Sequence, residues 1–417
     1  MRRKQISLAW SLALGIGLAL TILVSQPVPA QTYSVLHSFT GGADGAYPMA
    51  GLTIDAAGSL YGTAYFGGYQ GSGCAGCGTV FKLSPKGSGW IFTSLHNFKD
   101  SPDGRQPGGR VTFGPDGSLY GATAFGGEHG GGSAFNVKPP ARACLTALCP
   151  WTETVIHSFA GPNGEIPLGD VVFDPAGNLY GTTTQGGRGR GNAYELSPSN
   201  GSWTETNLNA FQDGSTPYSG VILDQAGNVY GTSYYPDSGF IFELIPPGWQ
   251  FQQLHRFNGS DGFDPLGGLI FDSAGNLYGG TLLGGSNDDG TIYELSPSNG
   301  AWTLTTLYNF TQGNQNSGGG PWASLTMDAA GDLYGTTYSG GVYGYGSVFK
   351  LTHSSGGWTY TSLHDFCTGG YPCADGAYPY SNVVFDKKGN LYGTASEGGS
   401  CLSGGQDSCG VVWMITP

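Results

Sequence analysis

The sequence predicts an all-β protein, a seven-bladed β-propeller of four-stranded antiparallel blades. Three observations lead to this prediction. Glycine supplies 76 of the 417 residues, and aromatic residues reach 13% whereas charged residues reach only 11%. A Leu/Val-Tyr-Gly motif recurs seven times, and the strand that the last repeat lacks is found at the N-terminus. Disordered chains have few aromatic residues and helical bundles are rich in Ala, Leu, Glu and Lys, so the composition excludes both classes.

The N-terminus has the pattern of an export signal. Basic residues at positions 2–4 precede an apolar run over residues 8–24, and a small residue, Ala30, ends the segment. We therefore expect residues 1–30 to be a signal peptide and residues 31–417 to be the propeller, with a retained anchor helix as the alternative. The rest of the sequence has no second apolar span. We expect an exported protein, extracellular or periplasmic, with no transmembrane span after cleavage.

The tyrosine motif marks a unit that recurs every 48 to 60 residues. Its seven tyrosines are Tyr61, Tyr120, Tyr180, Tyr230, Tyr278, Tyr334 and Tyr392. An Asp-x-x-Gly stretch comes before each motif except the second, where the order differs slightly; residues 174–183 show it most clearly. Asp can bond its own backbone and Gly tolerates positive φ, so this stretch predicts a hairpin between the first and second strands of a blade.

A third and a fourth strand follow in each unit. A glycine-rich loop leads to an apolar strand such as residues 78–83, and the next strand begins at a tryptophan that lies eight residues before a phenylalanine. The tryptophans are Trp90, Trp151, Trp203, Trp249, Trp302 and Trp358, and the phenylalanines are Phe98, Phe159, Phe211, Phe257, Phe310 and Phe366. Regular alternation would place both on one face of the strand. Four antiparallel strands per unit make one propeller blade.

The two chain ends complement one another. The last unit stops after its third strand, at residues 411–415, and lacks the tryptophan strand. Residues 33–39 match the Leu-His-x-Phe ending of a fourth strand but have no unit of their own. We expect this N-terminal strand to complete the last blade and close the ring, because closure removes the exposed edges of an open stack.

The repeat resembles the bacterial GloVer tandem-repeat proteins, whose members carry Leu-Tyr-Gly-Thr and Gly-Thr-Val-Phe-Lys-Leu elements. Residues 60–63 and 78–83 match these elements, and the resemblance covers essentially all of the chain after the leader. It implies an exported protein and no established activity. Members vary in how they are anchored, and we expect this chain to differ from them in having no C-terminal anchor. The Asp-x-x-Gly-Asn-Leu-Tyr hairpin is also similar, more loosely, to that of NHL and streptogramin-lyase-like propellers.

Eight cysteines form four pairs that are close in sequence. The pairs are Cys74/Cys77, Cys144/Cys149, Cys367/Cys373 and Cys401/Cys409. An even count with local pairing after an export signal predicts disulfides. Zinc is the alternative for Cys74/Cys77, which has the Cys-x-x-Cys spacing of a zinc half-site.

Aspartates and histidines recur at equivalent positions of several units, and such repetition favours a structural role over a catalytic one. Asp-Gly-x-x-Pro recurs before the first strand of several blades, at Asp44, Asp103, Asp213, Asp261 and Asp375. These carboxylates could form a ring for calcium or polar ligands, but a turn before each strand explains the repetition better. No cofactor is predicted; for calcium, the densest local candidate is residues 287–289, Asn-Asp-Asp. Five of the seven histidines recur in the fourth strand, and we expect them to bond between blades rather than to catalyse.

Departures from the repeat point to a binding site. The fourth unit replaces its Gly-Gly loop with Tyr234, Tyr235, Pro236 and Asp237, and the third offers Arg188 and Arg190. We expect these side chains to line a recess on the face that carries the fourth-to-first and second-to-third connections, where three of the cysteine pairs also fall. Drift of the loop sequences is the alternative.

The chain has a net charge of −13, and we expect no nucleic-acid partner. The first functional hypothesis is an exported, non-catalytic binding or scaffold propeller, a monomer that presents acidic, aromatic, disulfide-stapled loops to a glycan or protein partner. The second is a lyase or hydrolase with its site at the mouth of the central channel. The second hypothesis requires a non-repeated histidine or carboxylate pair at that mouth.

Overall fold

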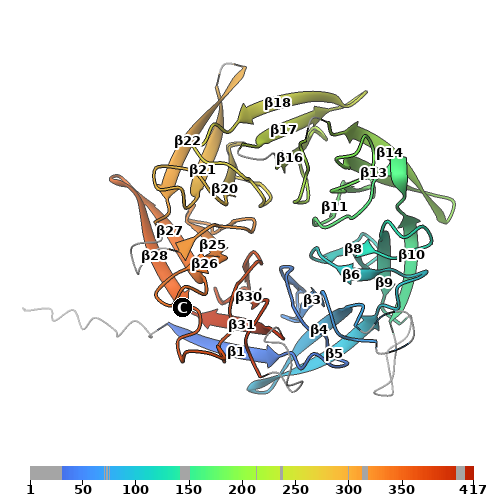
Figure 1. The fold of residues 1–417 in the computed structure, drawn as a ribbon, viewed down its shortest axis with the longest axis horizontal. Helices are drawn as coiled ribbons and strands as arrows, with labels where there is room; N and C mark the ends of the chain where they lie inside the picture. Colours follow the sequence, from blue (N-terminus) through green and yellow to red (C-terminus); the bar gives the residue numbers. More distant parts are fainter. Residues whose placement is uncertain are drawn as a thin grey trace, which may run out of the picture. The chain divides into compact units, whose positions relative to one another are not determined.

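The seven predicted blades surround a central axis (Figure 1). The computed structural model describes residues 31–69, 71, 74, 76–140, 151–212, 214–234, 238–298, 300–311, 318–400 and 409–417. Gln31–Pro417 forms one compact unit. Each blade is a sheet of four antiparallel strands, so the predicted propeller is confirmed. In the described part of the chain, no helix is long and apolar enough to span a membrane.

We number the blades I to VII, from β2–β5 to the blade that holds both chain ends, and list their strands from the axis outward. The innermost strands are β2 (Thr53–Ile54), β7 (Thr112–Phe113), β11 (Val172–Phe173), β15 (Ile222–Leu223), β19 (Ile270–Phe271), β24 (Thr326–Met327) and β29 (Val384–Phe385). The second strands are β3 (Leu60–Ala64), β8 (Leu119–Phe125), β12 (Leu179–Thr182), β16 (Val229–Ser233), β20 (Leu277–Thr281), β25 (Leu333–Thr337) and β30 (Leu391–Ala395).

The two outer positions follow the same order. The third strands are β4 (Thr79–Lys86), β9 (Ser133–Lys138), β13 (Asn192–Ser199), β17 (Phe240–Ile245), β21 (Thr291–Ser298), β27 (Ser347–Ser354) and β31 (Val411–Thr416). The fourth strands are β5 (Gly89–Asn97), β10 (Thr152–Ser158), β14 (Ser202–Ala210), β18 (Gln250–Arg256), β22 (Ala301–Asn309), β28 (Gly357–Asp365) and β1 (Thr32–Ser38). The remaining elements are β6 (Arg105–Pro107), which pairs with β8, the pair β23 (Gly318–Gly319) and β26 (Ser339–Gly340), and a 3-10 turn, η1 (Gly161–Asn163).

The hairpin between the first and second strands forms as its sequence predicts. In blade III, the Asp174 carboxylate accepts hydrogen bonds from the backbone N–H and the side-chain amide of Asn178, both at 2.8 Å. Gly177 has φ +90°, a conformation that costs glycine little. The Tyr180 hydroxyl donates to the same carboxylate at 3.3 Å. The aspartate therefore ties the turn to the tyrosine motif that follows it.

The N-terminal strand closes the ring, as predicted. β1 pairs antiparallel with β31, from Thr32 opposite Thr416 to Ser38 opposite Val411. The Phe39 N–H extends this pairing with a 3.0 Å bond to the Gly410 carbonyl oxygen. The strand lies one residue earlier than the expected range of 33–39. Blade VII thus has no unpaired outer edge on its third strand.

The expectation that Trp and Phe share one face of the fourth strand was wrong. In β5, Ser94 lies opposite Phe81 and His96 lies opposite Val80, so Leu95 is an extra residue in a β-bulge. The bulge reverses the alternation beyond it. Trp90 therefore packs in the core between blades VII and I, whereas Phe98 is buried between blades I and II. Every fourth strand has a register shift at this position.

The hydrophobic core lies between neighbouring blades rather than within one blade. Tyr61 of blade I packs against Phe113 and Trp151 of blade II, with ring centroids 5.2 and 6.2 Å away. The glycine after the tyrosine makes room for an aromatic ring, because a Cβ on Gly62 would lie 2.6 Å from Phe81 Cζ. The Tyr-Gly pair therefore serves blade packing on both faces of the second strand.

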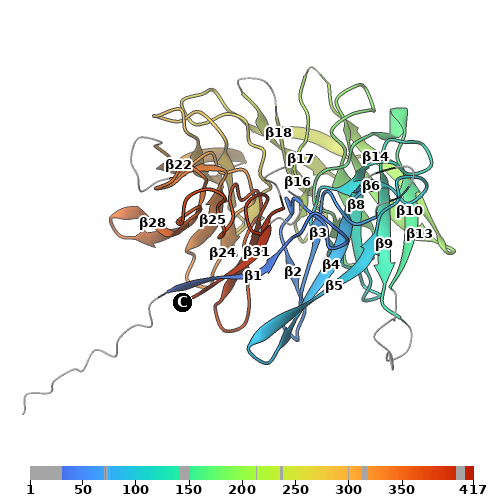
Figure 2. The same cartoon turned by 60° about the horizontal axis from the view of Figure 1, so that its bottom comes forward.

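The connections separate onto two faces of the ring (Figure 2). The fourth-to-first and second-to-third connections, residues 39–52 and 65–78 for blade I, lie on one face, which we call the loop-rich face. The hairpins between first and second strands and between third and fourth strands lie on the opposite face. Figure 1 views the loop-rich face.

Candidate functional site

The central channel opens on the loop-rich face as a cavity of about 620 Å³. Its lining includes two layers of residues from the short segments that lead from a proline to each innermost strand, together with residues of the innermost strands themselves. The layer nearer the face contains Met49, Gly108, Leu168, Tyr218, Leu266, Trp322 and Tyr380. The deeper layer contains Gly51, Arg110, Asp170, Gly220, Gly268, Ser324 and Asn382.

One ion pair breaks the symmetry of the deeper layer. Arg110 Nε lies 3.2 Å from Asp170 Oδ2, and the Arg110 backbone N–H donates to Asp170 Oδ1 at 2.7 Å. The other five positions carry glycine, serine or asparagine. Among the described residues that line the channel, the non-repeated charged group is therefore an Arg–Asp pair, and not the histidine or carboxylate pair that the enzyme hypothesis requires.

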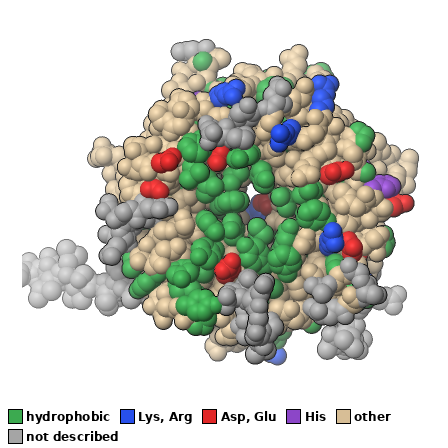
Figure 3. Space-filling view, viewed as in Figure 1, with side chains coloured by type: hydrophobic (Ala, Val, Ile, Leu, Met, Phe, Trp, Pro, Cys, Tyr) green, Lys and Arg blue, Asp and Glu red, His purple; other side chains and the backbone are tan. Residues whose placement is uncertain are grey.

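A connected group of aromatic rings lies beside the channel mouth, and Trp322 and Tyr380 line the cavity. We call six of its members the aromatic cluster: Tyr47, Phe66, Trp322, Tyr338, Tyr378 and Tyr380. Tyr380 lies at its centre, with the Tyr338 and Trp322 ring centroids 4.9 and 5.2 Å away. All six come from connections on the loop-rich face. Figure 3 shows hydrophobic side chains gathered around the opening.

Three phenols of the aromatic cluster are held in the neutral form. Burial raises the pKa of Tyr380, and the phenols of Tyr338 and Tyr47 raise it further. Burial likewise raises the pKa values of Tyr47 and Tyr378. The cluster therefore offers apolar ring faces together with neutral O–H groups, which can both donate and accept hydrogen bonds.

The predicted recess between blades III and IV is only partly described. Tyr234 directly follows β16 and is bridged to Thr216, and its ring meets Tyr218 edge-on at 5.8 Å. Since Tyr218 lines the channel, Tyr234 lies beside the same mouth. Arg188 and Arg190 are exposed in the connection between β12 and β13. Tyr235 and Asp237 lie outside the described residues.

Sequence reasoning missed the aromatic cluster itself. A signal was present, because the position after the proline carries Tyr218, Trp322 and Tyr380 in three units and small or aliphatic residues in the others.

The repeated aspartates stabilise the turns in which they lie. Asp44 lies 3.1 Å from His37 Nε2 and accepts the Thr40 backbone N–H at 3.0 Å. Burial alone would raise the pKa of Asp44, but the hydrogen bonds from His37 and Thr40 lower it. Asp103, Asp261 and Asp375 make the same contact with His96, His255 and His364. The turn interpretation is confirmed for these four, and Asp213 lies outside the described residues.

One of these His–Asp pairs has a second carboxylate beside it. The ligand atoms of His96, Asp103 and Glu153 all lie within 4.8 Å of one another, at the boundary of blades I and II. Burial, and secondarily Asp103, raises the pKa of Glu153 to about 7. One imidazole and two carboxylates would suit zinc better than calcium. The His–Asp contact itself recurs in blades without this second carboxylate, so it serves the turn.

The calcium candidate at residues 287–289 has no such arrangement. Among the described residues, Asp288 and Asp289 belong to no comparable group of possible ligands. The Asn287 side chain donates to the Phe310 carbonyl oxygen at 3.1 Å, so it ties its loop to the end of the neighbouring strand.

Two of the predicted disulfides are fully described. Cys74 is bonded to Cys77 and Cys367 to Cys373, with Cα–Cα distances of 5.7 and 4.2 Å. Disulfide bonding replaces the zinc alternative for Cys74/Cys77.

The other two predicted disulfides involve residues that the structure does not describe. Cys409 is described: it is buried, packs in the core between blades VII and I, and is disulfide-bonded, as predicted. Its expected partner, Cys401, lies outside the described residues, so the pairing of Cys409 with Cys401 is not shown and stays a prediction. Cys144 and Cys149 also lie outside the described residues, and their pairing stays a prediction.

Comparison with solved structures shows the same fold at low identity. The extracellular domain of a protein described as a hybrid two-component system from B. thetaiotaomicron matches with 15% identity and a TM-score of 0.53, covering 91% of this chain and 39% of that one. Puromycin hydrolase matches with 10% identity and a TM-score of 0.56, covering 87% of this chain and 52% of that one. This chain therefore spans about two fifths and about half of their lengths.

Sequence comparison supplies the family. No curated protein matches the chain. The model of the Gloeobacter/Verrucomicrobia repeat matches residues 22–153 and 235–417, which is most of the chain and includes the tyrosine motifs of every blade except III and IV. Blades III and IV follow the same strand order and turn chemistry. The chain therefore belongs to the Gloeobacter/Verrucomicrobia repeat family.

Proposed function

We propose that this protein is an exported binding propeller that holds a glycan at the aromatic cluster on its loop-rich face. The observation that carries the proposal is the aromatic cluster, of which Trp322 and Tyr380 line the mouth of a cavity of about 620 Å³. The fold and the family fit a binding or scaffold role.

The chemistry of the mouth suits a sugar. Pyranose rings present a C–H face that packs on an aromatic ring, and their hydroxyl groups need paired donors and acceptors when they leave water. Trp322 and Tyr380 supply ring faces that meet at 90°, and the neighbouring Tyr338 supplies a phenol. Below them, Arg110 and Asp170 offer a charged donor and acceptor. An apolar site with a few placed polar groups is the usual form of a ligand pocket.

The residues predicted from the sequence extend this surface in the proposal. Tyr234 packs against Tyr218, which lines the mouth at blade IV. Tyr235, Asp237, Arg188 and Arg190 belong to the connections of blades III and IV that lead to the same face. We include them as a second wall for an extended glycan.

Export is part of the proposal. The basic, apolar and small-residue pattern of residues 1–30 supports a cleaved leader. The Cys74–Cys77 and Cys367–Cys373 disulfides support an oxidising compartment, because cytosolic thiols are kept reduced.

A retention assay tests the proposal. The purified protein is applied to a glycan array and to insoluble peptidoglycan, chitin and cellulose. We expect retention on at least one of these, and a loss of about tenfold or more in affinity for Trp322→Ala and for Tyr380→Ala, as for a central contact residue. Ile91→Ala is the matched control, since Ile91 is exposed on β5, away from the mouth. Absence of retention, or equal retention by all four proteins, would contradict the proposal.

A further inference from the structure

Stacked rings join the fourth strands of neighbouring blades at three boundaries. His37 of blade VII stacks on Phe92 of blade I, with centroids 4.3 Å apart and planes at 17°. The same positions carry Tyr308 on Tyr360 between blades V and VI, and His364 on Tyr33 between blades VI and VII, at 5.1 and 3.7 Å. The first residue of each pair follows the β-bulge of its strand, and the second lies two residues after the tryptophan position.

The second ring of two of these pairs also stacks on an aromatic ring of its own blade. Phe92 is stacked at 5.6 Å on Phe81 of its own blade, and Tyr360 at 5.7 Å on Phe349. Each of these rings is thus held between a ring of its own blade and a ring of the preceding blade. Phe92 and Tyr360 are accordingly half-buried.

The boundary between blades III and IV lacks the outer ring. Phe251 of β18 is stacked at 6.2 Å on Phe242 of its own blade, as the pattern requires. The stacking position of the preceding blade is Asn209, which has no ring. Phe251 is consequently 44% exposed, and a cavity of about 340 Å³ lies against it.

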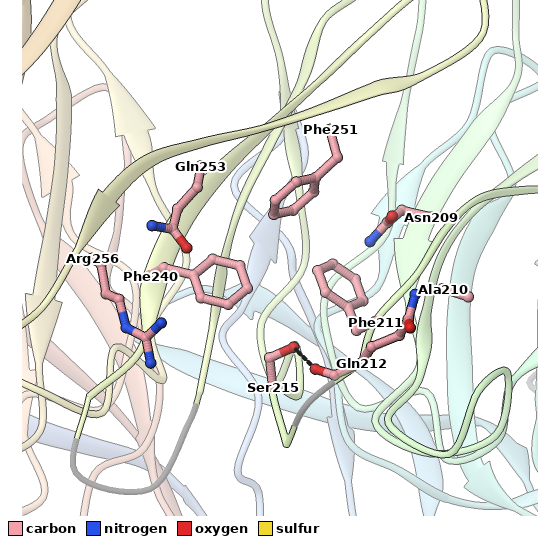
Figure 4. Close-up of a pocket in the computed structure, with 9 residues that line it drawn as sticks. All are labelled: Asn209, Ala210, Phe211, Gln212, Ser215, Phe240, Phe251, Gln253 and Arg256. Atoms are coloured by element: carbon pink, nitrogen blue, oxygen red, sulfur yellow. Dashed lines mark hydrogen bonds between the residues drawn. The ribbon is translucent and has the colours of Figure 1, made fainter.

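The cavity combines aromatic walls with amide groups (Figure 4). Phe211, Phe240 and Phe251 form the apolar walls. Phe240 is itself a departure from the repeat, because the first residue of the third strand is Thr, Ser, Asn or Val in the other blades. The side chains of Asn209 and Gln253 line the same space, and such amides can both donate and accept hydrogen bonds.

Two further boundaries show that a missing ring need not leave a cavity. His157 of blade II lies 3.1 Å from Glu205 of blade III, and His96 of blade I lies close to Glu153 of blade II. In both cases a long carboxylate side chain occupies the stacking position of the receiving blade. At blades III and IV the aromatic ring of the second blade, Phe251, is retained and its partner is the shorter Asn209, so one face of Phe251 borders a cavity.

We propose that this lateral cavity binds a small planar aromatic or heteroaromatic molecule, which stacks on Phe251 where other boundaries place an imidazole or a phenol. The Asn209 and Gln253 amides meet its polar edge. The site lies between the fourth strands at the outside of the ring and is separate from the channel mouth, so it does not depend on the proposed glycan site.

Titration with indole, followed by NMR of the ligand and of the protein, tests the proposal. We expect wild-type protein to bind indole with a dissociation constant of about 1 mM, typical of a fragment of this size. Cyclohexanol is apolar but not planar, and we expect it to bind at least tenfold more weakly. Equal binding of the two, or no binding of indole, would overturn the proposal.

Two variants locate the binding. Asn209→His restores the ring of the repeat and should weaken indole binding at least tenfold, because the imidazole fills the cavity. Phe251→Ala removes the stacking face at an exposed position and should weaken binding to the same extent without refilling the space. Asn207→His is the matched control, since Asn207 is exposed on the same strand and does not line the cavity. Unchanged binding by Asn209→His or Phe251→Ala would contradict this location.

Discussion

His37 of the closing strand β1 and Phe92 of β5 lie in adjacent blades, VII and I, and their ring centroids are 4.3 Å apart. They lie on successive fourth strands of the chain, and both positions follow from local features. His37 follows the bulge of β1, which turns its side chain toward blade I, while Phe92 precedes the bulge of β5 and faces back toward blade VII. The bulge in each fourth strand therefore allows one strand to contact both neighbouring blades.

Replacing His37 with asparagine should weaken the packing between blades VII and I. His37→Asn removes the stack on Phe92 and the contact with Asp44, and these two interactions together contribute about 2 kcal/mol to the free energy of unfolding. Urea denaturation followed by tryptophan fluorescence measures the change. His129→Asn is the control, because His129 is exposed in a loop of blade II. Equal stability of the His37 variant and wild-type protein would contradict a role for this contact.

Glu153 should make stability fall as the pH rises toward neutrality. Its pKa is raised from 4.5 in the unfolded chain to about 7 in the folded protein, so the folded state binds more protons between these values. The free energy of unfolding therefore decreases across pH 4.5–7. After allowance for solvent screening, the decrease amounts to about 1–2 kcal/mol.

Glu153→Gln isolates this contribution. The variant cannot ionise at this position, so its unfolding free energy should lack that component of the decrease between pH 4.5 and 7. Denaturation curves at several pH values measure the difference from wild-type protein. Glu128→Gln, at an exposed loop position, should keep the wild-type slope. If Glu153→Gln shows the same pH dependence of the unfolding free energy as wild-type protein, Glu153 is not the group responsible.

Four local disulfides should be found in the exported protein. Two are described in full, Cys409 is disulfide-bonded, and the spacing of Cys144/Cys149 and Cys401/Cys409 predicts the other two linkages. Peptide mapping by mass spectrometry without reduction should give these four linkages and no reactive thiol. A linkage between two of the predicted pairs, such as Cys409 with a cysteine other than Cys401, would show that the local interpretation is wrong.

The leader should be removed after Ala30. Expression of the full chain in a bacterial host, followed by mass spectrometry of the secreted or periplasmic protein, should give an N-terminus at Gln31. Gln31 directly precedes β1, so the closing strand would be retained. Intact residues 1–30 in membrane-bound protein would instead support the anchor alternative.

Much of the fold could be predicted because each blade repeats its turn chemistry. Asp174 and Gly177 specify a hairpin from local bonds, and the unmatched strand at residues 33–39 specifies closure. The faces of the fourth strand were mispredicted because period-two alternation takes no account of a bulge. The sequence carries a sign of the bulge. Leu95 follows Trp90 by an odd number of residues and Phe98 follows it by an even number, so strict alternation would place these two apolar side chains on opposite faces of the strand.

The candidate sites depend on contacts between blades, which repeat comparison alone does not give. Tyr380 and Trp322 are far apart in sequence and meet only because consecutive blades bring their connections to the same mouth. The lateral cavity exists because Asn209 has no ring to stack on Phe251. This cannot be recognised without knowing that the two positions face one another across the blade boundary.

A crystal structure with the retained oligosaccharide bound is the most direct test of glycan binding at the aromatic cluster. The account predicts a sugar ring packed within about 4 Å of Trp322 or Tyr380, a usual contact distance, with a hydroxyl bonded to Tyr338. A sugar bound only on the opposite face or at the outside of the ring, with Trp322 and Tyr380 uncontacted, would contradict it.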